Sequence, residues 1–259
     1  MKPNKLNQVI ADGGTPVGHM IWEFGTRGIA RVVDNADLDF VVIDMEHTGF
    51  GHETVADLLA WFRGTDIAPF VRIPQRLYHF IARTLDAGAL GIMVANVQDA
   101  DEAREVISAA KYAPLGNRGV GLGGAHTDYS PPDPVAYFEE SNRNTTIICQ
   151  IESVKGVDNV EAIAATEGVD VVWVGHFDLT QTMGIPGQFQ DPRFLAALDR
   201  VVAAARDNGI RAGIQPASIA QAQQWLDIGF DVISWNTDLG VYSRALKSDL
   251  TELRGKITP

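Results

Sequence analysis

Short apolar runs recur along the chain, separated by longer stretches in which apolar residues come three or four positions apart. The longer stretches predict amphipathic helices. The short runs are rich in Val and Ile and do not alternate with polar residues, which is typical of strands buried on both faces of a parallel sheet. Eight such strands are predicted, at Val17–Trp22, Phe40–Ile43, Pro69–Ile73, Gly91–Val94, Thr146–Ile151, Val171–Val174, Ala212–Gln215 and Val232–Trp235.

Several predicted helices have recognisable ends. Asp191 is expected to cap a helix that Pro192 opens, because its side chain can accept a hydrogen bond from a first-turn amide and proline needs no amide partner there. Ser218 and Gly229 bracket the next helix in the same way. Glycines after helical stretches are expected to end them in a left-handed conformation. They are Gly64, Gly88, Gly168 and Gly209.

Eight strands with helical crossovers allow two architectures, a closed (β/α)8 barrel or a doubly wound open sheet. The open sheet usually has a glycine-rich phosphate loop after its first strand, and residues 23–28 lack the G-x-G-x-x-G pattern. The sequence therefore predicts an α/β fold of the TIM-barrel type, as a single domain over residues 1–259. Its main irregularity is Gly116–Asn144, which has the composition of a long loop, and such loops are usually functional.

Composition narrows the range of partners and compartments. A net charge of -12 argues against a nucleic acid or an anionic membrane as partner, because both require a basic surface. No apolar run is long enough to cross a bilayer and the first residues lack an apolar signal core, so a cytoplasmic protein is expected. Cys149, the single cysteine, lies in an apolar run and is expected to pack within a strand.

Polar residues cluster at the ends of several predicted strands, where a barrel carries its catalytic groups. Glu152 follows the fifth strand and Asp178 follows the sixth. Two carboxylates on neighbouring strand ends repel each other, and a divalent metal with oxygen ligands would resolve that conflict. The alternative is structural, with Asp178 as a helix cap and Glu152 in a surface ion pair.

An arginine and a histidine are further candidates. Arg72 lies in an apolar strand and needs an anion, either a substrate carboxylate or a core carboxylate such as Glu46. His47 follows Asp44 by three residues, and the pair could form a carboxylate-oriented imidazole for proton transfer. A histidine in a loop can equally be incidental.

Schiff-base chemistry on a lysine is another mechanism that this fold supports, and it would need a lysine desolvated inside the barrel. No lysine lies within a predicted strand. Lys155, three residues beyond Glu152, is the nearest and is expected on the following loop or helix. The lysine mechanism is therefore disfavoured.

Five segments, in this order, resemble the HpcH/HpaI aldolase family, whose members include 4-hydroxy-2-oxoheptanedioate aldolase and 2-keto-3-deoxy sugar-acid aldolases. The likeness extends over nearly the whole chain, and the segments are specific together although each alone is weak. They are Val42–His47, Val71–Pro74, Tyr112–Gly119, Gln150–Glu152 and Val174–Leu179.

The resemblance implies a barrel enzyme that depends on a divalent metal (Mg, Mn or Co). Such an enzyme would cleave 4-hydroxy-2-oxo acids to pyruvate and an aldehyde, or join them in reverse. Carried over by motif, Glu152 and Asp178 would be the metal ligands, and Gln150 would hydrogen-bond near the substrate. Arg72 would hold the pyruvate oxygens and stabilise the enolate.

The resemblance implies further roles around the same pocket. His47, oriented by Asp44, would transfer a proton, and Trp22 resembles an aromatic residue that many members have at the end of the first strand. Members are commonly hexamers, trimers of dimers that exchange a C-terminal helix, so Ser243–Ile257 is expected to pack on a neighbour. Four loop residues would bind the pyruvate carboxylate through their backbone amides: Gly175, His176, Phe177 and Asp178.

Three positions depart from the usual family pattern. Met45 stands where many members have glycine, and His176 and Ala95-Asn96 stand where many have proline. These departures affect the identity of the aldehyde more than the class of reaction. We expect His176, Phe177 and the stretch Gly116–Asn144 to shape the aldehyde side of the pocket, and a contribution from a neighbouring subunit stays open.

Two other functions stay open at this point. An acyl-CoA lyase like the citrate lyase β subunit or malyl-CoA lyase would need a basic surface for the CoA phosphates, and no suitable cluster is evident in the sequence. A barrel without catalytic activity could serve as a binding protein, but the complete set of metal, arginine and histidine candidates speaks against decay.

Overall fold

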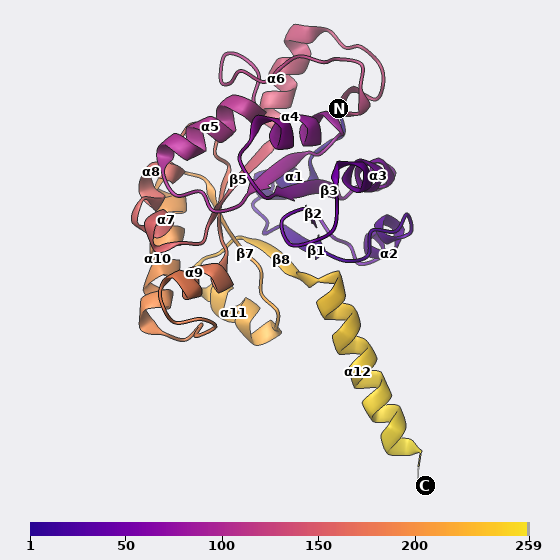
Figure 1. Cartoon of the computed structure of the whole chain (residues 1–259), viewed down its shortest axis with the longest axis vertical. Helices are drawn as coiled ribbons and strands as arrows, with labels where there is room; N and C mark the ends of the chain where they lie inside the picture. The colour runs from indigo at the N-terminus through magenta and orange to yellow at the C-terminus, as the bar shows by residue number, and fades with distance from the viewer. Residues whose placement is uncertain (258–259) are drawn as a thin grey trace.

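The computed structural model describes residues 1–257, and its eight parallel strands form a closed barrel (Figure 1). Each strand pairs with the next one in sequence, and β8 pairs with β1. The predicted TIM-barrel fold is confirmed, and every strand lies within two residues of its predicted bounds. The strands are β1 (Val17–Ile21), β2 (Phe40–Asp44), β3 (Ala68–Ile73), β4 (Gly91–Val94), β5 (Thr146–Ile151), β6 (Val171–Val174), β7 (Arg211–Ile214) and β8 (Val232–Thr237).

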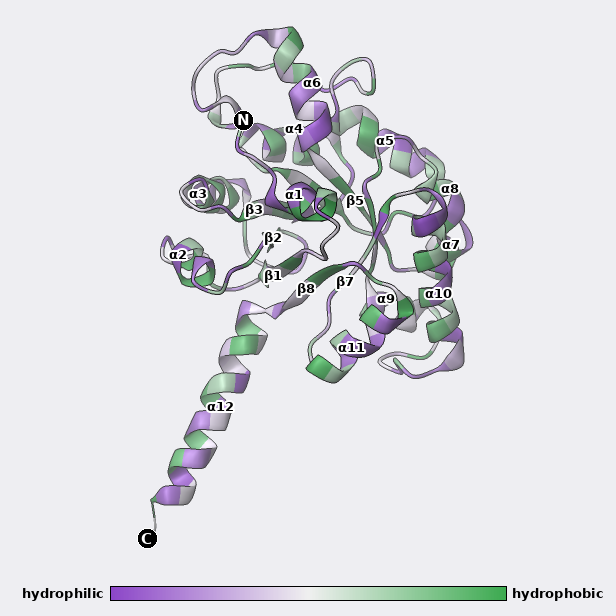
Figure 2. Cartoon of the chain, turned by 180° about the vertical axis from the view of Figure 1, so that it is seen from behind, coloured by the Kyte–Doolittle hydropathy of each residue, from purple (hydrophilic) through white to green (hydrophobic). Residues whose placement is uncertain are grey.

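Helices follow the strands and lie around the outside of the barrel (Figure 1). Figure 2 shows hydrophobic residues beside hydrophilic ones along them, as expected for helices with one face against the strands. The helices are α1 (Lys5–Ala11), α2 (Ile29–Asp34), α3 (His52–Phe62), α4 (Tyr78–Asp86), α5 (Ala100–Ala110), η1 (Ala125–Thr127), α6 (Pro134–Asn144), α7 (Val154–Asp158), α8 (Val160–Ala164), α9 (His176–Thr182), α10 (Pro192–Asp207), α11 (Ile219–Ile228) and α12 (Asp238–Lys256).

Three large aromatic rings fill much of the barrel interior, each against a glycine of the neighbouring strand. The register pairs are Gly18 with Phe40, Gly91 with Phe70 and Gly213 with Trp173. A Cβ on Gly213 would overlap the Trp173 ring, so the glycine leaves the space that the indole occupies. At the N-terminal end of the barrel, Leu6 of α1 is fully buried against this interior cluster. The interior is therefore closed at that end.

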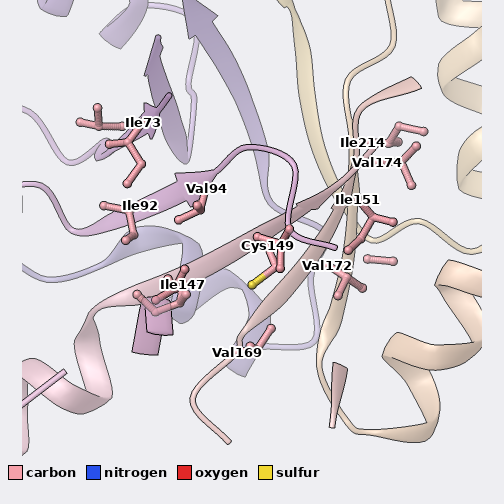
Figure 3. Close-up of a cluster of buried hydrophobic side chains, with 14 of the residues drawn as sticks. Ile73, Ile92, Val94, Ile147, Cys149, Ile151, Val169, Val172, Val174 and Ile214 are labelled. Atoms are coloured by element: carbon pink, nitrogen blue, oxygen red, sulfur yellow. The ribbon is translucent and has the colours of Figure 1, made fainter. Parts of the chain in front are cut away.

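A second apolar layer lies between the strands and the helices. Figure 3 shows Cys149 within it, with Ile147 and Ile151 of the same strand and Val172 nearby. Cys149 is fully buried, and burial raises the pKa of its thiol to about 12. A protonated, inaccessible thiol is unreactive. The prediction that Cys149 packs within a strand is confirmed.

The predicted helix ends are confirmed with one exception. The side chains of Asp191 and Ser218 cap α10 and α11 by accepting hydrogen bonds from first-turn amides at 2.8 and 3.2 Å. The expected positive φ is found at Gly88, Gly168, Gly209 and Gly229. It is absent at Gly64, because after α3 the chain continues in right-handed turns, with the Gly64 amide 3.4 Å from the Trp61 carbonyl.

The stretch Gly116–Asn144 differs from its prediction as a loop. It contains η1 and α6, and α6 is capped by Asp133 ahead of Pro134. Because the stretch links a helix to the start of β5, it lies at the N-terminal end of the barrel, where the Asn4 side chain donates to the Asn144 carbonyl at 2.8 Å. None of its residues, all of which are described, lines the cavity at the other end. The expectation that this stretch shapes the aldehyde side of the pocket of its own chain is therefore wrong.

The last helix, α12, projects away from the barrel (Figures 1 and 2). Asp238 at its start is its one buried residue. The exposed apolar side chains recur three or four positions apart, so they share one face. They are Leu239, Tyr242, Leu246, Leu250 and Leu253. Over residues 1–257, no helix combines the length and the apolar character that a membrane span requires.

Candidate active site

A cavity of about 220 Å³ opens at the C-terminal end of the barrel, the end at which this fold carries its chemistry. Most of the predicted site residues line it. Asp44 and Glu152 do not, but they contact Arg72 and Gln150, which do. The lining consists of Trp22, His47, Arg72, Gln150, Trp173, Val174, Gly175, His176, Phe177, Asp178 and Gln215.

Arg72 is held in place by a buried bidentate ion pair. Its Nε and Nη2 atoms donate to the two carboxylate oxygens of Asp44 at 2.7 and 2.8 Å. Burial disfavours the charge, but the hydrogen bonds and charge of Asp44, with the charges of Glu46 and Glu152, together outweigh this effect and raise the pKa of Arg72, so the guanidinium stays charged. Within residues 1–257, Nη1 has no hydrogen-bond partner, and the side chain lines the cavity. Nη1 is therefore the group available to an anionic substrate oxygen.

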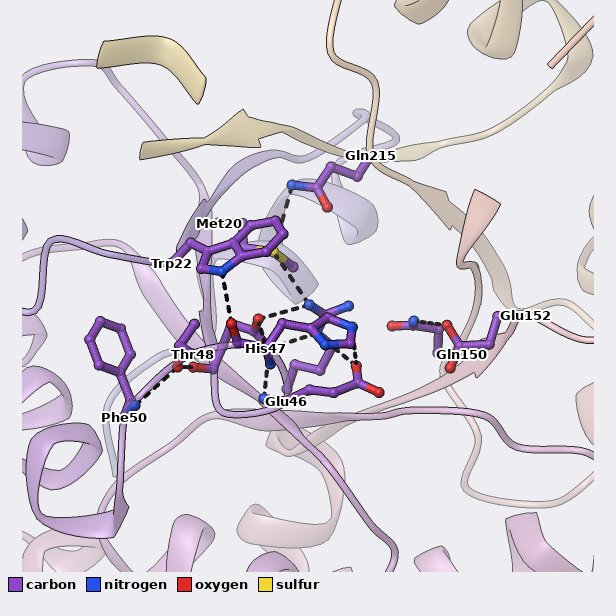
Figure 4. Close-up of polar contacts among 11 residues, drawn as sticks. Met20, Trp22, Glu46, His47, Thr48, Phe50, Gln150, Glu152 and Gln215 are labelled. Carbon is purple, nitrogen blue, oxygen red and sulfur yellow. Dashed lines mark hydrogen bonds and ion pairs between the residues drawn. The ribbon is translucent and has the colours of Figure 1, made fainter. Parts of the chain in front are cut away.

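The imidazole of His47 faces Glu46 and not Asp44. The sequence predicted instead that Asp44 orients this imidazole. Asp44 instead accepts from the backbone amides of Glu46 and His47 at 3.0 and 3.3 Å, because Arg72 occupies its other lone pairs. His47 Nε2 lies 3.6 Å from Glu46 Oε2, which in turn lies 3.3 Å from Arg72 Nε (Figure 4). Asp44 thus positions the turn, and Glu46 is the carboxylate beside the ring.

Glu152 places a buried carboxylate at the end of β5, with 5% of the residue exposed. Gln150 Nε2 donates to its Oε2 atom (Figure 4). Gly175 makes this possible, because a Cβ there would overlap Glu152 Oε2 and lie 2.9 Å from Gln150 Nε2. Burial raises the pKa of Glu152 to about 7, and the negative charges of Glu46 and Asp178 add to the rise.

The donor set of this region fits a divalent cation. Asp44, Glu46 and Glu152 lie around Arg72, and Asp178 lies near Glu46 and Glu152, so four carboxyl groups accompany a single arginine. Gln150 Oε1 is buried without a partner in the part of the chain that the structure describes. Oxygen donors of this kind suit Mg or Mn. No three His, Cys, Asp or Glu side chains among residues 1–257 form a ready-made metal cluster, so solvent or substrate oxygens would have to complete the coordination.

The loop after β6 forms part of the wall. α9 begins at His176, so the amides of His176, Phe177 and Asp178 lie in its first turn, and none of them donates to a backbone carbonyl of the described residues. The His176 ring packs 4.7 Å from Phe177 and 5.1 Å from Phe189 and Trp225, between ring centroids. Burial lowers the pKa of His176 to about 4, so its imidazole is neutral. Phe177 is 62% exposed.

Trp22 lines the cavity from the loop after β1. Its indole Nε1 donates to the His47 carbonyl at 3.1 Å, which joins the two predicted residues (Figure 4). Its backbone amide, with those of Glu23 and Phe24, donates to the carboxylate of Asp238. The first residue of α12 therefore anchors this part of the site.

Three cavity residues, Trp173, Val174 and Gln215, were not identified as site residues from the sequence. Trp173 lies in an apolar run without alternation, so the pattern could not show that it faces the interior. Gln215 ends a predicted apolar strand, and that position at a strand end was the available signal.

The lysine mechanism gains no support from the positions of the lysines. Lys155 is 54% exposed and pairs with Asp99 at 2.8 Å. The buried lysine is Lys111, which donates to the Asn142 carbonyl at 2.8 Å at the other end of the barrel. No lysine of the described chain lines the cavity.

Comparison with known proteins gives the family. A 5-keto-4-deoxy-D-glucarate aldolase of Escherichia fergusonii is 36% identical over 93% of this chain and 93% of its own length. The structure of an HpcH/HpaI aldolase from Desulfitobacterium hafniense has a TM-score of 0.92 and 31% identity, covering 98% of this chain and 97% of that chain. The citrate synthase SbnG has a TM-score of 0.87 and 26% identity, covering 99% of both chains. The model of the HpcH/HpaI aldolase/citrate lyase family matches residues 20–245, so this chain belongs to that family, as its motifs predicted.

Proposed function

We propose that this lyase is a metal-dependent aldolase that cleaves 4-hydroxy-2-oxo acids to pyruvate and an aldehyde and catalyses the reverse addition. One observation carries the proposal: a charged arginine with a free N–H group lines the cavity at the catalytic end of the barrel together with Asp178, and three further carboxylates lie beside it. The arginine suits the oxygens of an oxo acid, and the carboxylates suit a cation.

The names of the relatives support a sugar-derived substrate. In 5-keto-4-deoxy-D-glucarate, the named substrate of the Escherichia fergusonii enzyme, the ketone adjoins a carboxylate and the deoxy carbon adjoins the ketone. The next carbon carries a hydroxyl, which is the 4-hydroxy-2-oxo pattern that aldol cleavage needs. We therefore propose a sugar-derived acid of this class for the present enzyme.

Cleavage requires removal of the C4 hydroxyl proton and stabilisation of charge on the ketone oxygen. In the proposed mechanism His47 accepts that proton, the C3–C4 bond breaks and C4 becomes the aldehyde carbon. The bond electrons pass into the C2–C3 bond, and charge collects on the C2 oxygen. Arg72 Nη1 donates to this oxygen while Asp44 holds the guanidinium. Protonation of C3 then yields pyruvate.

Glu152 and Asp178 are the residues that we propose to hold the cation, with Gln150 beside them. When bound, a divalent cation supplies Lewis-acid polarisation of a carbonyl oxygen. The first-turn amides of His176, Phe177 and Asp178 are proposed to hold the pyruvate carboxylate, which would satisfy donors that lack a backbone partner.

We also propose that the enzyme is a homo-oligomer in which α12 packs on a neighbouring copy. The helix projects from the barrel with an exposed apolar stripe, which would lose its contact with water in such an assembly. Light scattering should give a mass above that of one chain, and the double variant Leu246→Glu/Leu250→Glu should lower it. A monomeric wild-type protein would contradict the proposal.

The proposed reaction is tested by incubating the metal-loaded enzyme with pyruvate and a panel of aldehydes. We expect pyruvate-dependent consumption of aldehyde, and Arg72→Ala should lower kcat by about 100-fold or more. Arg104→Ala removes a guanidinium that is exposed and paired with Asp101, and it should not alter the rate. No consumption with any aldehyde, together with turnover of an acyl-CoA thioester, would move the enzyme to the citrate lyase branch.

A further inference from the structure

Gln215 lines the cavity but has no part in the steps described above. It follows β7 directly, and Figure 4 shows its side chain reaching toward Trp22 and Met20. The Met20 Sδ atom lies 3.7 Å from Gln215 Nε2 and 4.0 Å from Arg72 Nη2. One thioether therefore separates Gln215 from the arginine that is proposed to hold the pyruvate unit.

The orientation of the Gln215 amide is determined by the backbone of β8. Its Nε2 atom donates to the Asn236 carbonyl at 2.7 Å, and the opposite orientation would bring two carbonyl oxygens together at that distance. Asn236 has a left-handed backbone, with φ of 51°, and lies where the register between β1 and β8 shifts. Such irregularities redirect groups beside active sites. Here the bulge turns a carbonyl toward the Gln215 amide.

This arrangement leaves Gln215 Oε1 as an acceptor. It accepts no hydrogen bond from residues 1–257, and Gln215 is half-buried at the cavity wall. A neutral acceptor binds a donor such as a hydroxyl and gains nothing from a carbonyl or carboxylate oxygen. Pyruvate and its enolate present acceptor oxygens to the site. Of the two halves of the substrate, the aldehyde half is therefore the one that can offer Oε1 a hydroxyl donor.

We infer that Gln215 accepts a hydrogen bond from a hydroxyl on the carbon next to the aldehyde carbonyl, and thereby selects 2-hydroxyaldehydes over alkyl aldehydes of equal length. The inference rests on the proposed function, because it concerns the second substrate of the same reaction. The C4 hydroxyl of the cleavage substrate is already assigned to His47, so the hydroxyl that meets Gln215 is the one on C5.

Matched aldehyde pairs test the inference. The metal-loaded enzyme is saturated with pyruvate, and kcat/KM is measured for glycolaldehyde against acetaldehyde and for 2-hydroxypropanal against propanal. The variants are Gln215→Leu and, because leucine is branched, the unbranched Gln215→Met. Gln223→Leu is the control, since Gln223 is an exposed residue that pairs with Asp227 in α11.

One neutral hydrogen bond at a half-buried site corresponds to a discrimination of about three- to tenfold. We expect the hydroxylated-to-alkyl ratio of kcat/KM to fall by this factor in both Gln215 variants, while the alkyl aldehydes keep their rates and the control keeps its ratio. Equal losses for both members of a pair would show a merely structural role and overturn the inference, as would an unchanged ratio. If wild-type enzyme joins pyruvate to no aldehyde, the proposed function fails and the inference with it.

Discussion

Replacing Glu152 by glutamine should stabilise the metal-free protein while weakening its response to metal. The folded state raises the pKa of Glu152 from 4.5 to about 7, through burial first and then through Glu46 and Asp178. The unfolded chain therefore loses this proton at lower pH than the folded chain. The contribution of Glu152 to the free energy of unfolding therefore falls as the pH rises from 4.5 toward 7, and the loss is complete above pH 7.

The size of the effect follows from the shift in pKa. A tenfold change in proton affinity corresponds to about 1.4 kcal/mol, so a rise in pKa from 4.5 to about 7 gives a cost of about 3–4 kcal/mol above pH 7. Glutamine carries no charge and still offers an oxygen to Gln150 Nε2. Glu152→Gln should therefore raise the melting temperature by roughly 5–10 °C at pH 8, with no gain below pH 4.5.

The assay is thermal unfolding followed by circular dichroism, in excess chelator and again with added Mn²⁺. Ligand that binds only the folded state stabilises it, so Mn²⁺ should raise the melting temperature of wild type more than that of Glu152→Gln. Glu139→Gln is the control, because Glu139 is exposed and forms no ion pair with another described residue. If Glu152→Gln does not raise the melting temperature at pH 8, or raises it by the same amount at acid pH, the electrostatic origin of the effect is refuted.

Three further changes separate the roles of other residues. Arg72→Lys keeps the charge but loses the paired contact with Asp44, so kcat should fall, and a change confined to KM would mean uniform binding instead. His47→Ala should lower kcat by about 10²–10⁴ and abolish the acidic limb of the kcat/KM profile, whereas a limb that persists at the same pH would make water the base. Gly213→Ala forces a methyl group into the Trp173 ring and should cost about 1–3 kcal/mol in urea unfolding, against no change for the open position Gly49→Ala.

The fold was predictable because each apolar run is short, rich in Val and Ile and followed by a helix with clear ends. Cap chemistry at Asp191 and Ser218 is local, so the sequence shows it directly. The prediction for Gly64 was wrong, because the chain makes right-handed turns there. The helix α6 was not predicted, because the prolines on both sides of Asp133 gave the segment the composition of a loop.

The site was predictable as a set of residues more than as a set of contacts. Strand ends placed Arg72 and Glu152 together, because parallel strands of a barrel end on the same face. Which carboxylate meets His47 depended on the competition for Asp44, whose oxygens Arg72 occupies. The orientation of the Gln215 amide depended on a bulge in β8, and strand pairing of this kind is not visible in one sequence.

The most direct test of the account is the release of pyruvate from a generic 4-hydroxy-2-oxo acid, measured before chelation, in excess chelator and after adding back Mg²⁺, Mn²⁺ or Co²⁺. The account predicts turnover that chelator abolishes and that at least one of these cations restores. Full turnover in excess chelator would contradict the assignment of Glu152 and Asp178 as holders of a catalytic cation.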